Sequence, residues 1–391
     1  MVTKITNGKI ISDSVLEGYS LYFKDDKILD ITKEQLPHDK EIDADGNYIS
    51  AGFIDVHLHG GGGYDFMDGG KEPIEKAANF HLSHGTTSLM PTTLSCSAKT
   101  LASFLEDLKT AKLSGRVKNN ILGAHIEGPY VAPAQAGAQN PEYIKAPDPD
   151  EYITILKNYS DIICRWSFAP ELEGSVDFCK QLLSFGVSPS VAHSNAVYED
   201  VKAVYDVGCR TVTHLYSSMS SITRENGYRR LGVIESAYLL DDITVEVIAD
   251  GKHLPKELLK LVLKCKPMDK ICLVTDAMRA AGTEEYTSFL GRRGEEVPCV
   301  IEDSVAKLPD KTSFAGSIAT ADRLVRTMVK EAGLDIAVAV SMITKVPSNA
   351  FGIKNKGELR TGFDADIVIF DNEIKIKNVI VGGKEYGNQN L

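Results

Sequence analysis

Two histidines at the end of an apolar run are the first residues in this sequence whose types and spacing could do chemistry. His57 and His59 close the segment 53–59, and alternate residues of a strand face the same side of a sheet. Both imidazoles would therefore point together, which suits a pair of nitrogen ligands for a divalent metal ion. The remaining ligands would have to come from elsewhere in the chain.

Other candidate ligands also close short apolar or β-branched runs. They are Glu127, His193, His214 and Asp276. A lone histidine after a strand is most often structural, but the same placement repeated within one chain favours a shared metal site. His38, His81 and His84 lack this placement, and we expect them to be structural.

The runs that carry these residues alternate with amphipathic segments, which is the pattern of repeated βα units and a parallel sheet. The apolar runs span 53–56, 86–90, 121–126, 162–169, 187–192, 211–213, 244–249 and 271–275. The helical pattern is plainest at 71–84, 98–112, 176–185, 198–207 and 256–265. Eight runs would close a (β/α)8 barrel, whose catalytic residues lie at the carboxyl ends of the strands.

A doubly wound open sheet is the alternative fold. It would spread the strand ends along a line instead of gathering them at one mouth. It would also be expected to carry a glycine-rich dinucleotide fingerprint after the first run, and none is present there. The barrel is therefore the preferred prediction.

The two ends of the chain differ from the middle in their pattern of apolar and turn residues. Residues 3–50 contain short strand patterns broken by turn residues, and strand patterns return at 367–370 and 379–381. Neither end has enough apolar surface to fold alone, so we expect the two to pair. The sequence thus predicts an α/β protein in which a catalytic TIM-like barrel at 51–353 is inserted into a small β-sandwich domain made of 1–50 and 354–391.

Composition and charge exclude several classes of function. The chain has 391 residues, 43% of them hydrophobic and 25% charged, with a net charge of −11. This balance argues against nucleic acid or an anionic membrane as a partner, because both need broad basic surfaces. No apolar stretch is long enough for a signal peptide or a membrane span, which predicts a cytoplasmic protein. The 7 scattered cysteines are expected to be mostly buried apolar residues.

These motifs resemble the metal-dependent amidohydrolase superfamily, and within it the N-acetylglucosamine-6-phosphate deacetylase family. The resemblance spans nearly the whole chain and rests on His57-x-His59, on the strand-end residues His193, His214 and Asp276, and on the glutamate in 125–129. The segments 214–216, 248–253, 274–278, 315–317 and 362–366 match the same pattern. Glu127 takes the metal-bridging role that many relatives give to a carboxylated lysine.

The resemblance implies a divalent metal site with one or two ions. One metal would be held by Glu127, His193 and His214, and a second by His57, His59, Glu127 and Asp276. Zinc suits this nitrogen-rich set best, and iron(II) or another transition ion is the alternative. Such a site would support attack of water on an acetamide carbonyl, with Asp276 as the catalytic residue that carries the proton to the leaving amine.

The resemblance also implies a phosphorylated amino sugar as the substrate and a homodimer as the assembly. Arg224 matches the family's phosphate-binding arginine, and a planar guanidinium suits bidentate bonds to phosphate. In family members, residues reach the phosphate across a subunit interface, so a homodimer is implied. His253 would contact the substrate and orient the reacting group. The other positions expected to bind substrate are Ala138, Gln139, Ser217, Ser218, Phe314, Ala315 and Gly316.

Two departures from the family pattern bear on the substrate. Gln139 stands where a histidine is common, and Ser217-Ser218 stands where Asn-Ala is common. A serine hydroxyl offers a different donor and acceptor set from an amide, so the sugar epimer or the need for phosphate could differ.

We expect a hydrolase of a C–N bond that converts N-acetylglucosamine 6-phosphate to glucosamine 6-phosphate and acetate. One alternative is a deacetylase of another N-acetylhexosamine, such as the galactosamine epimer. A second is another amidohydrolase acting on a C–N bond, which would leave Arg224 without a phosphate to bind. A catalytically silent scaffold is the third, and the intact set of ligands weighs against it.

Overall fold

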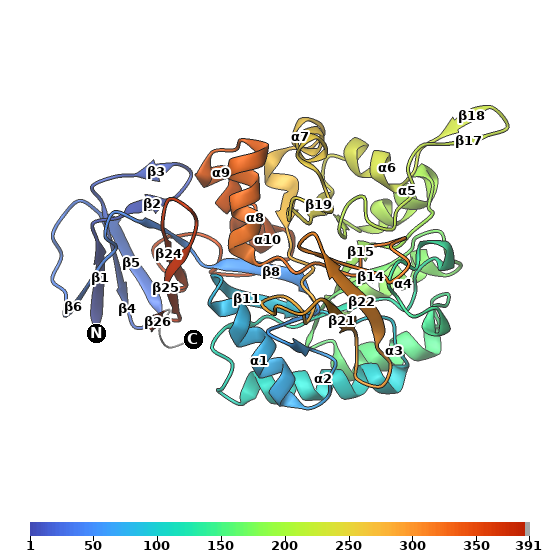
Figure 1. Cartoon of the computed structure of the whole chain (residues 1–391), viewed down its shortest axis with the longest axis horizontal. Coiled ribbons are helices and arrows are strands. Elements are labelled where there is room, and N and C mark those ends of the chain that lie inside the picture. Colours follow the sequence, from blue (N-terminus) through green and yellow to red (C-terminus); the bar gives the residue numbers. More distant parts are fainter. Residues whose placement is uncertain (388–391) are drawn as a thin grey trace.

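A barrel of parallel strands forms most of the computed structural model, which describes residues 1–387 (Figure 1). Its strands are β8 (Phe53–Leu58), β11 (Thr86–Pro91), β13 (Ala124–Glu127), β14 (Ile163–Phe168), β15 (Ser188–Val191), β16 (Thr211–Val212), β19 (Thr244–Val247) and β20 (Ile271–Leu273). Neighbouring strands pair in parallel, and a bridge between Thr92 and His125 links β11 to β13. The ring closes where the Asp276 amide donates to the His57 carbonyl oxygen at 2.9 Å. The predicted (β/α)8 barrel is confirmed.

The third predicted run is divided into two short strands. The first, β12 (Asn120–Ile121), pairs with β11, whereas β13 pairs with β14. Between them, Gly123 passes so close to the next strand that a Cβ atom would lie 2.6 Å from both the Cys164 sulfur and the Ile162 carbonyl oxygen. Only glycine fits there, which allows β13 to bend toward β14 and carry Glu127 to the barrel mouth.

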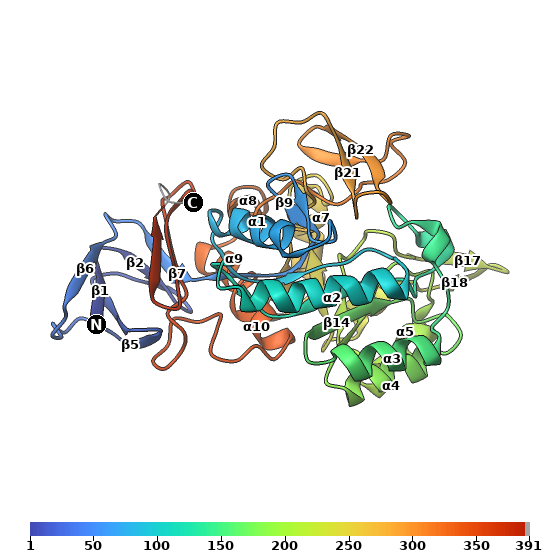
Figure 2. The same ribbon diagram turned by 90° about the horizontal axis from the view of Figure 1, so that it is seen from below.

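Helices surround the barrel (Figures 1 and 2). Five of them, α1 (Lys71–Leu82), α2 (Ala98–Leu113), α4 (Ser175–Ser184), α5 (Tyr198–Val207) and α7 (Lys256–Cys265), lie where the amphipathic pattern predicted them. The others were not predicted and are α3 (Pro149–Tyr159), α6 (Val233–Leu239), α8 (Ala321–Thr327), α9 (Ile336–Ser341) and α10 (Lys345–Ala350). In residues 1–387, no helix is both long enough and apolar enough to cross a membrane.

The two ends of the chain meet in the small β module beside the barrel. One sheet has the order β5-β4-β1-β6, and the other has the order β26-β25-β24-β7-β2-β3. The strands are β1 (Val2–Thr6), β2 (Lys9–Ile11), β3 (Val15–Leu16), β4 (Ser20–Lys24), β5 (Lys27–Thr32), β6 (Lys40–Asp43), β7 (Tyr48–Ala51), β24 (Ile367–Phe370), β25 (Ile376–Val381) and β26 (Lys384–Gly387). The central joint is the antiparallel pair β7 and β24, in which Ile49 lies opposite Ile369.

A separate apolar core holds this module together. Ile5, Leu21, Ile49 and Ile369 are buried in it. We propose that 1–50 and 354–391 form one domain and that 51–353 form the other. Residues 388–391 at the end of the first domain lie outside the described residues.

Three further β elements were not predicted, and one of them is the short antiparallel hairpin of β9 (Gly60–Gly61) and β10 (Tyr64–Asp65) that follows His59. A hairpin of β17 (Thr223–Glu225) and β18 (Tyr228–Arg230) projects away from the barrel in both views (Figures 1 and 2). An antiparallel sheet of β21 (Thr287–Leu290), β22 (Val297–Glu302) and β23 (Val305–Lys307) lies between β20 and α8 in the sequence. The strands of the projecting hairpin are short and exposed, so they lack the apolar pattern on which prediction depends. The strands β21, β22 and β23 are partly buried, and their pattern was overlooked.

Aromatic packing joins β14 to the helix layer. The Trp166 ring stacks on Tyr130 with centroids 5.8 Å apart, and Phe178 of α4 meets Trp166 edge-on at 5.3 Å. All three side chains are fully buried, and the Trp166 indole donates to the Gly128 carbonyl oxygen at 2.8 Å. This cluster fixes β14 beside the segment that follows Glu127.

Replacement of Phe178 by alanine should therefore destabilise the protein by about 3–5 kcal/mol, because a large aromatic side chain leaves a cavity in a closed core. Urea unfolding followed by the fluorescence of Trp166, the 1 tryptophan of the chain, measures this change. Phe289→Ala, at a side chain that is 49% exposed, is the control and should shift stability by less than about 0.5 kcal/mol. Equal unfolding midpoints for the two variants would contradict this role of the cluster.

Candidate metal centre

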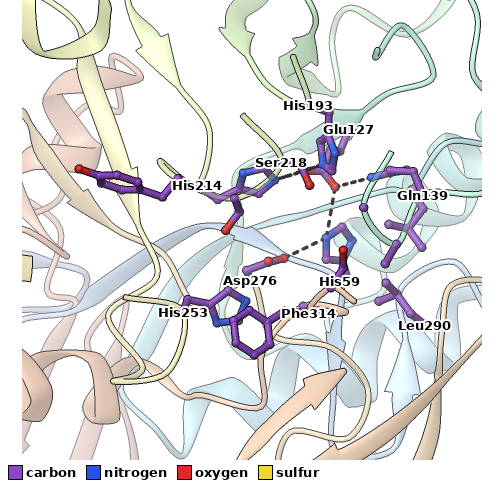
Figure 3. Close-up of a pocket in the computed structure, with 17 residues that line it drawn as sticks. His59, Glu127, Gln139, His193, His214, Ser218, His253, Asp276, Leu290 and Phe314 are labelled. Atoms are coloured by element: carbon purple, nitrogen blue, oxygen red, sulfur yellow. Dashed lines mark hydrogen bonds and ion pairs between the residues drawn. The ribbon is translucent and has the colours of Figure 1, made fainter. Parts of the chain in front are cut away.

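Six ionisable side chains meet at the carboxyl-terminal mouth of the barrel, and Figure 3 shows them except for His57. All are buried, and they are His57, His59, Glu127, His193, His214 and Asp276. The structure therefore brings together every residue that was predicted as a metal ligand. They form two groups, each with its ligand atoms within 4.8 Å of one another.

The first group contains Glu127, His193 and His214. Glu127 Oε1 lies 3.0 Å from His214 Nε2 and 3.3 Å from His193 Nε2, and the two nitrogens are 3.2 Å apart. The His193 Nδ1 atom donates to the Gln135 carbonyl oxygen at 2.8 Å, which leaves Nε2 as the atom that can bind a cation. One carboxylate oxygen and two imidazole nitrogens converging in this way are a typical zinc-binding set.

The second group contains His57, His59 and Asp276. Asp276 Oδ1 lies 3.1 Å from His59 Nε2 and 3.5 Å from His57 Nε2. Glu127 also faces this group, because its Oε1 lies 3.5 Å from His57 Nε2 and its Oε2 lies 3.5 Å from His59 Nε2. His57 Nε2 is buried without a hydrogen-bond partner among the described residues. A lone pair buried in this way fits a metal, and Glu127 is placed to serve both groups.

The backbone at three ligands adopts an unusual conformation. His193, His214 and Asp276 have φ angles of 43°, 30° and 49°, in the left-handed region that side chains other than glycine rarely occupy. Each residue lies two or three positions beyond the end of its strand, and the Asp276 turn is held on both sides, since its amide donates to the His57 carbonyl oxygen and its carbonyl oxygen accepts from the Ser317 amide at 2.8 Å. Such strained turns cluster at functional sites, and here they aim side chains into the mouth.

The two carboxylates of the site are held in their charged forms. Burial raises the pKa of Glu127, but His57, His193 and His214 outweigh burial and hold that pKa well below its ordinary value. The pKa of Asp276 is also lowered, because His57 and His59 outweigh the effect of burial. Metal binding requires deprotonated ligands, so a bound cation would displace any imidazole protons and be balanced by the two carboxylates.

A cavity of about 250 Å³ opens above the ligands. It is lined by most of the predicted substrate residues, namely Ala138, Gln139, Ser217, Ser218, His253, Phe314 and Gly316. The Phe314 ring lies 4.5 Å from the His253 ring, and His253 Nδ1 donates to Asp250 Oδ2 at 2.8 Å. The Nε2 atom of His253 therefore remains available to a bound molecule.

A model of the amidohydrolase family matches residues 48–387 of this sequence, which is most of its length. The chain belongs to the amidohydrolase family.

Relatives with named activities are similar over nearly their whole lengths. The N-acetylglucosamine-6-phosphate deacetylase of Lysinibacillus sphaericus is 31% identical over 373 residues, which cover 94% of this chain and 93% of the relative. The N-acetylgalactosamine-6-phosphate deacetylase of Escherichia coli O157:H7 is 28% identical over 344 residues, which cover 87% and 88%. The relatives thus include enzymes named for both sugar epimers.

Solved structures are also similar to this chain over nearly its whole length. N-acetylglucosamine-6-phosphate deacetylase from Pasteurella multocida superposes with a TM-score of 0.91 at 28% identity, covering 99% of this chain and 100% of that one. A variant of the enzyme from Mycobacterium smegmatis, in complex with N-acetyl-D-glucosamine-6-phosphate, superposes with a TM-score of 0.89 at 26% identity, covering 98% of each chain.

Gln139 of this amidohydrolase has its side chain engaged with the protein. Its Nε2 donates to Glu127 Oε2 at 2.8 Å (Figure 3), and its Oε1 accepts from the Ser95 amide at 2.6 Å. The amide thus holds the carboxylate that faces both ligand groups. Its role in binding substrate stays a prediction.

Two predicted substrate residues do not line the cavity of their own chain. Ala315 is fully buried, and its amide donates to the Ala306 carbonyl oxygen at 3.0 Å, so it supports the adjacent loop. Arg224 lies on β17 of the projecting hairpin and is exposed. Within residues 1–387, the Arg224 side chain has no hydrogen-bond or ion-pair partner.

Sequence reasoning missed two charged residues beneath the ligands. Arg165 on β14 and Glu246 on β19 form a fully buried ion pair, and Glu246 Oε2 accepts from His57 Nδ1 at 3.1 Å. A charged residue in the middle of an apolar barrel strand was the signal that could have revealed them. The histidines set aside as structural lie outside both ligand groups, and buried His81 donates from Nε2 to the Gly60 carbonyl oxygen at 2.9 Å.

Zinc content should separate the roles of the ligands. We expect His59→Ala to lower bound zinc by about one ion per chain, because it disables one of two groups, and Glu127→Ala to lower it by about two, because Glu127 faces both. Elemental analysis after dialysis against zinc measures both values. His38→Ala, at a histidine outside the ligand groups, is the control. Two zinc ions retained in the Glu127 variant would contradict its shared role.

Proposed function

We propose that this protein hydrolyses the N-acetyl group of N-acetylglucosamine 6-phosphate and releases glucosamine 6-phosphate and acetate. The observation that carries the proposal is the pair of ligand groups joined through Glu127 on the floor of a polar cavity. The named activities of the relatives support it over almost the whole chain. The enzyme named for the galactosamine epimer makes N-acetylgalactosamine 6-phosphate the second candidate substrate.

Zinc is the metal that we propose, with one or two ions per subunit and iron(II) as the alternative. Glu127, His193 and His214 would hold one ion, and His57, His59 and Asp276, with Glu127, would hold the other. When bound, the metal would lower the pKa of water and polarise the acetamide carbonyl.

Asp276 is the proposed proton carrier. It belongs to the second group and also lines the cavity, with a side chain that is 10% exposed. As a carboxylate it accepts a proton from the attacking water, and as an acid it returns that proton to the amine, which must leave protonated. His253 points its free Nε2 into the same cavity while Asp250 fixes the ring. We propose that His253 orients the acetamide oxygen.

Arg224 is the proposed ligand of the phosphate, and it requires a second subunit. Its hairpin projects away from the barrel, and its guanidinium does not line the cavity of its own chain. Contact with the substrate would therefore come from the hairpin of a neighbouring protomer. We propose a homodimer in which each hairpin supplies Arg224 to the partner's cavity.

We also propose that the protein works in the cytoplasm. Its proposed substrate carries a phosphate, and a charged group does not partition into an apolar bilayer. An enzyme of sugar phosphates must therefore share the compartment in which they are made.

Acetate release from N-acetylglucosamine 6-phosphate by the zinc-loaded protein tests the function. We expect turnover of this substrate, less of its galactosamine epimer and little of the unphosphorylated sugar. Asp276→Asn should lower kcat by about 10²–10⁴-fold, because an amide cannot carry the proton. Asp241→Asn, at an exposed aspartate, is the matched control. Faster turnover of the epimer would assign the protein to the second candidate substrate, and no turnover of either would refute the proposed function.

Mixing two impaired variants, assayed at a substrate concentration well below the raised KM, tests the exchange of Arg224. Arg224→Ala should raise KM for the phosphorylated substrate about 10–100-fold, because a charged hydrogen bond is lost. When it is mixed with Asp276→Asn under conditions that let subunits exchange, half of the dimers become mixed and each gains one complete site. Activity should then recover to about a quarter of the unaltered rate. If the mixture stays as inactive as its components, Arg224 does not act across the interface.

A further inference from the structure

A fully buried ion pair lies inside the barrel, directly beneath the metal ligands. Glu246 on β19 is 1% exposed and Arg165 on β14 is 0% exposed. Interiors of (β/α)8 barrels are ordinarily filled by layers of branched apolar side chains. A buried ion pair is at best weakly stabilising compared with apolar packing, so its presence here calls for a role beyond stability.

Glu246 contacts both ligand groups. Its Oε2 accepts from His57 Nδ1 at 3.1 Å and lies 3.3 Å from the backbone nitrogen of His214, which also donates to it. Its Oε1 is paired with Arg165. One carboxylate thereby fixes the ring of a ligand in one group and the backbone of a ligand in the other.

Arg165 anchors that carboxylate to the strands that carry the ligands. Its Nη1 donates to the Val56 carbonyl oxygen at 3.3 Å, next to His57. Its Nη2 donates to Thr213 Oγ1 at 3.0 Å, next to His214, and to Ser190 Oγ at 3.2 Å. The guanidinium therefore connects the chain positions that precede two of the ligands.

His57 is the ligand histidine that a carboxylate orients. His193 is held by a backbone carbonyl oxygen instead, and the Nδ1 atoms of His59 and His214 have no hydrogen-bond partner within the described part of the chain. When Nδ1 of His57 carries the proton, Nε2 keeps its lone pair free. That Nε2 is the buried atom without a hydrogen bond beside Glu127 and Asp276.

We propose that Glu246 is a positioning residue that fixes His57 in the tautomer able to bind metal through Nε2, and that Arg165 holds Glu246 in place for this task. The proposal rests on the proposed metal-dependent function. A carboxylate that holds a metal-binding histidine commonly raises metal affinity, and its loss lowers affinity about 10–100-fold. The effect should fall mainly on the group of His57, His59 and Asp276.

The substitution Glu246→Gln is the sharpest test, because it changes the hydrogen-bonding pattern with little change in shape. The glutamine carbonyl would face Arg165, so its amide nitrogen would donate to His57 Nδ1. That donor forces the proton of His57 onto Nε2 and blocks the metal-binding atom. We expect zinc binding at the His57 group to weaken about 10–100-fold, whereas binding at the His193 group changes less. Titration with zinc against a chromogenic chelator measures both affinities without substrate.

Asp322 provides a matched control. Its Oδ1 accepts from His84 Nδ1 at 3.1 Å and its Oδ2 pairs with Arg326 at 2.8 Å, the same arrangement at a place without candidate ligands. Asp322→Asn should change protein stability but leave both zinc affinities unaltered. A loss of zinc affinity equal to that of Glu246→Gln would overturn the proposal, because it would show a general effect of weakening the fold.

A charge-free double variant keeps the test valid if Glu246→Gln folds poorly. Arg165→Met with Glu246→Leu removes both buried charges, so neither is left unpaired. We expect a thermal unfolding midpoint of the zinc-free protein at or above that of the unaltered protein, together with weaker zinc binding at the His57 group. Unchanged zinc affinity in this variant would show that the pair is only structural and would overturn the proposal. Protein that binds zinc as expected but releases no acetate would refute the proposed function alone.

Discussion

The burial of six ionisable side chains at one barrel mouth is the constraint on which the rest of the structure depends. Each side chain loses solvation there, and none could remain charged without a partner of opposite charge. The carboxylates and the imidazoles offset the cost of burial for one another. Glu127 and Asp276 stand among four histidines, and their pKa values stay low because the neighbouring imidazoles outweigh burial. The parallel strands supply the positions and the strained turns after β15, β16 and β20 supply the directions.

The covering of the site depends on a second set of buried charges. Leu290, at the end of β21, and Phe314, in the segment that follows β23, both line the cavity. Asp65 accepts from the Gly291 amide at 3.0 Å, and Arg279 pairs with Asp68 at 3.0 Å while donating to the Gly291 carbonyl oxygen. These bonds tie the sheet to the short hairpin that follows His59. Polar contacts near His57 and His59 therefore hold both the floor and the cover of the cavity in place.

The metal ligands could be predicted from the sequence, whereas much of the rest of the site could not, for a physical reason. A ligand at the end of an apolar run is visible locally, so His57, His193 and Asp276 could be found from spacing alone, and the barrel followed from the repeated βα pattern. Arg165 and Glu246 lie inside such runs, and their pairing across the barrel depends on strand order, which no local pattern contains. The helix α3 was missed although Asp148 followed by Pro149 is a strong start signal. The exposed hairpin with Arg224 has no apolar face to reveal it, and only the resemblance to a family drew attention to that arginine.

The pairing of β7 with β24 has a consequence for how the chain is made. Ile49 leaves the ribosome long before Ile369, its partner across the joint. The sheet that contains both cannot be completed until the entire barrel has been synthesised, at about 5–20 residues per second. During that interval the early strand edge has no partner, and exposed edges invite pairing with other chains. Rapid closure of the barrel would shorten the distance that the late strands must search to find the early ones.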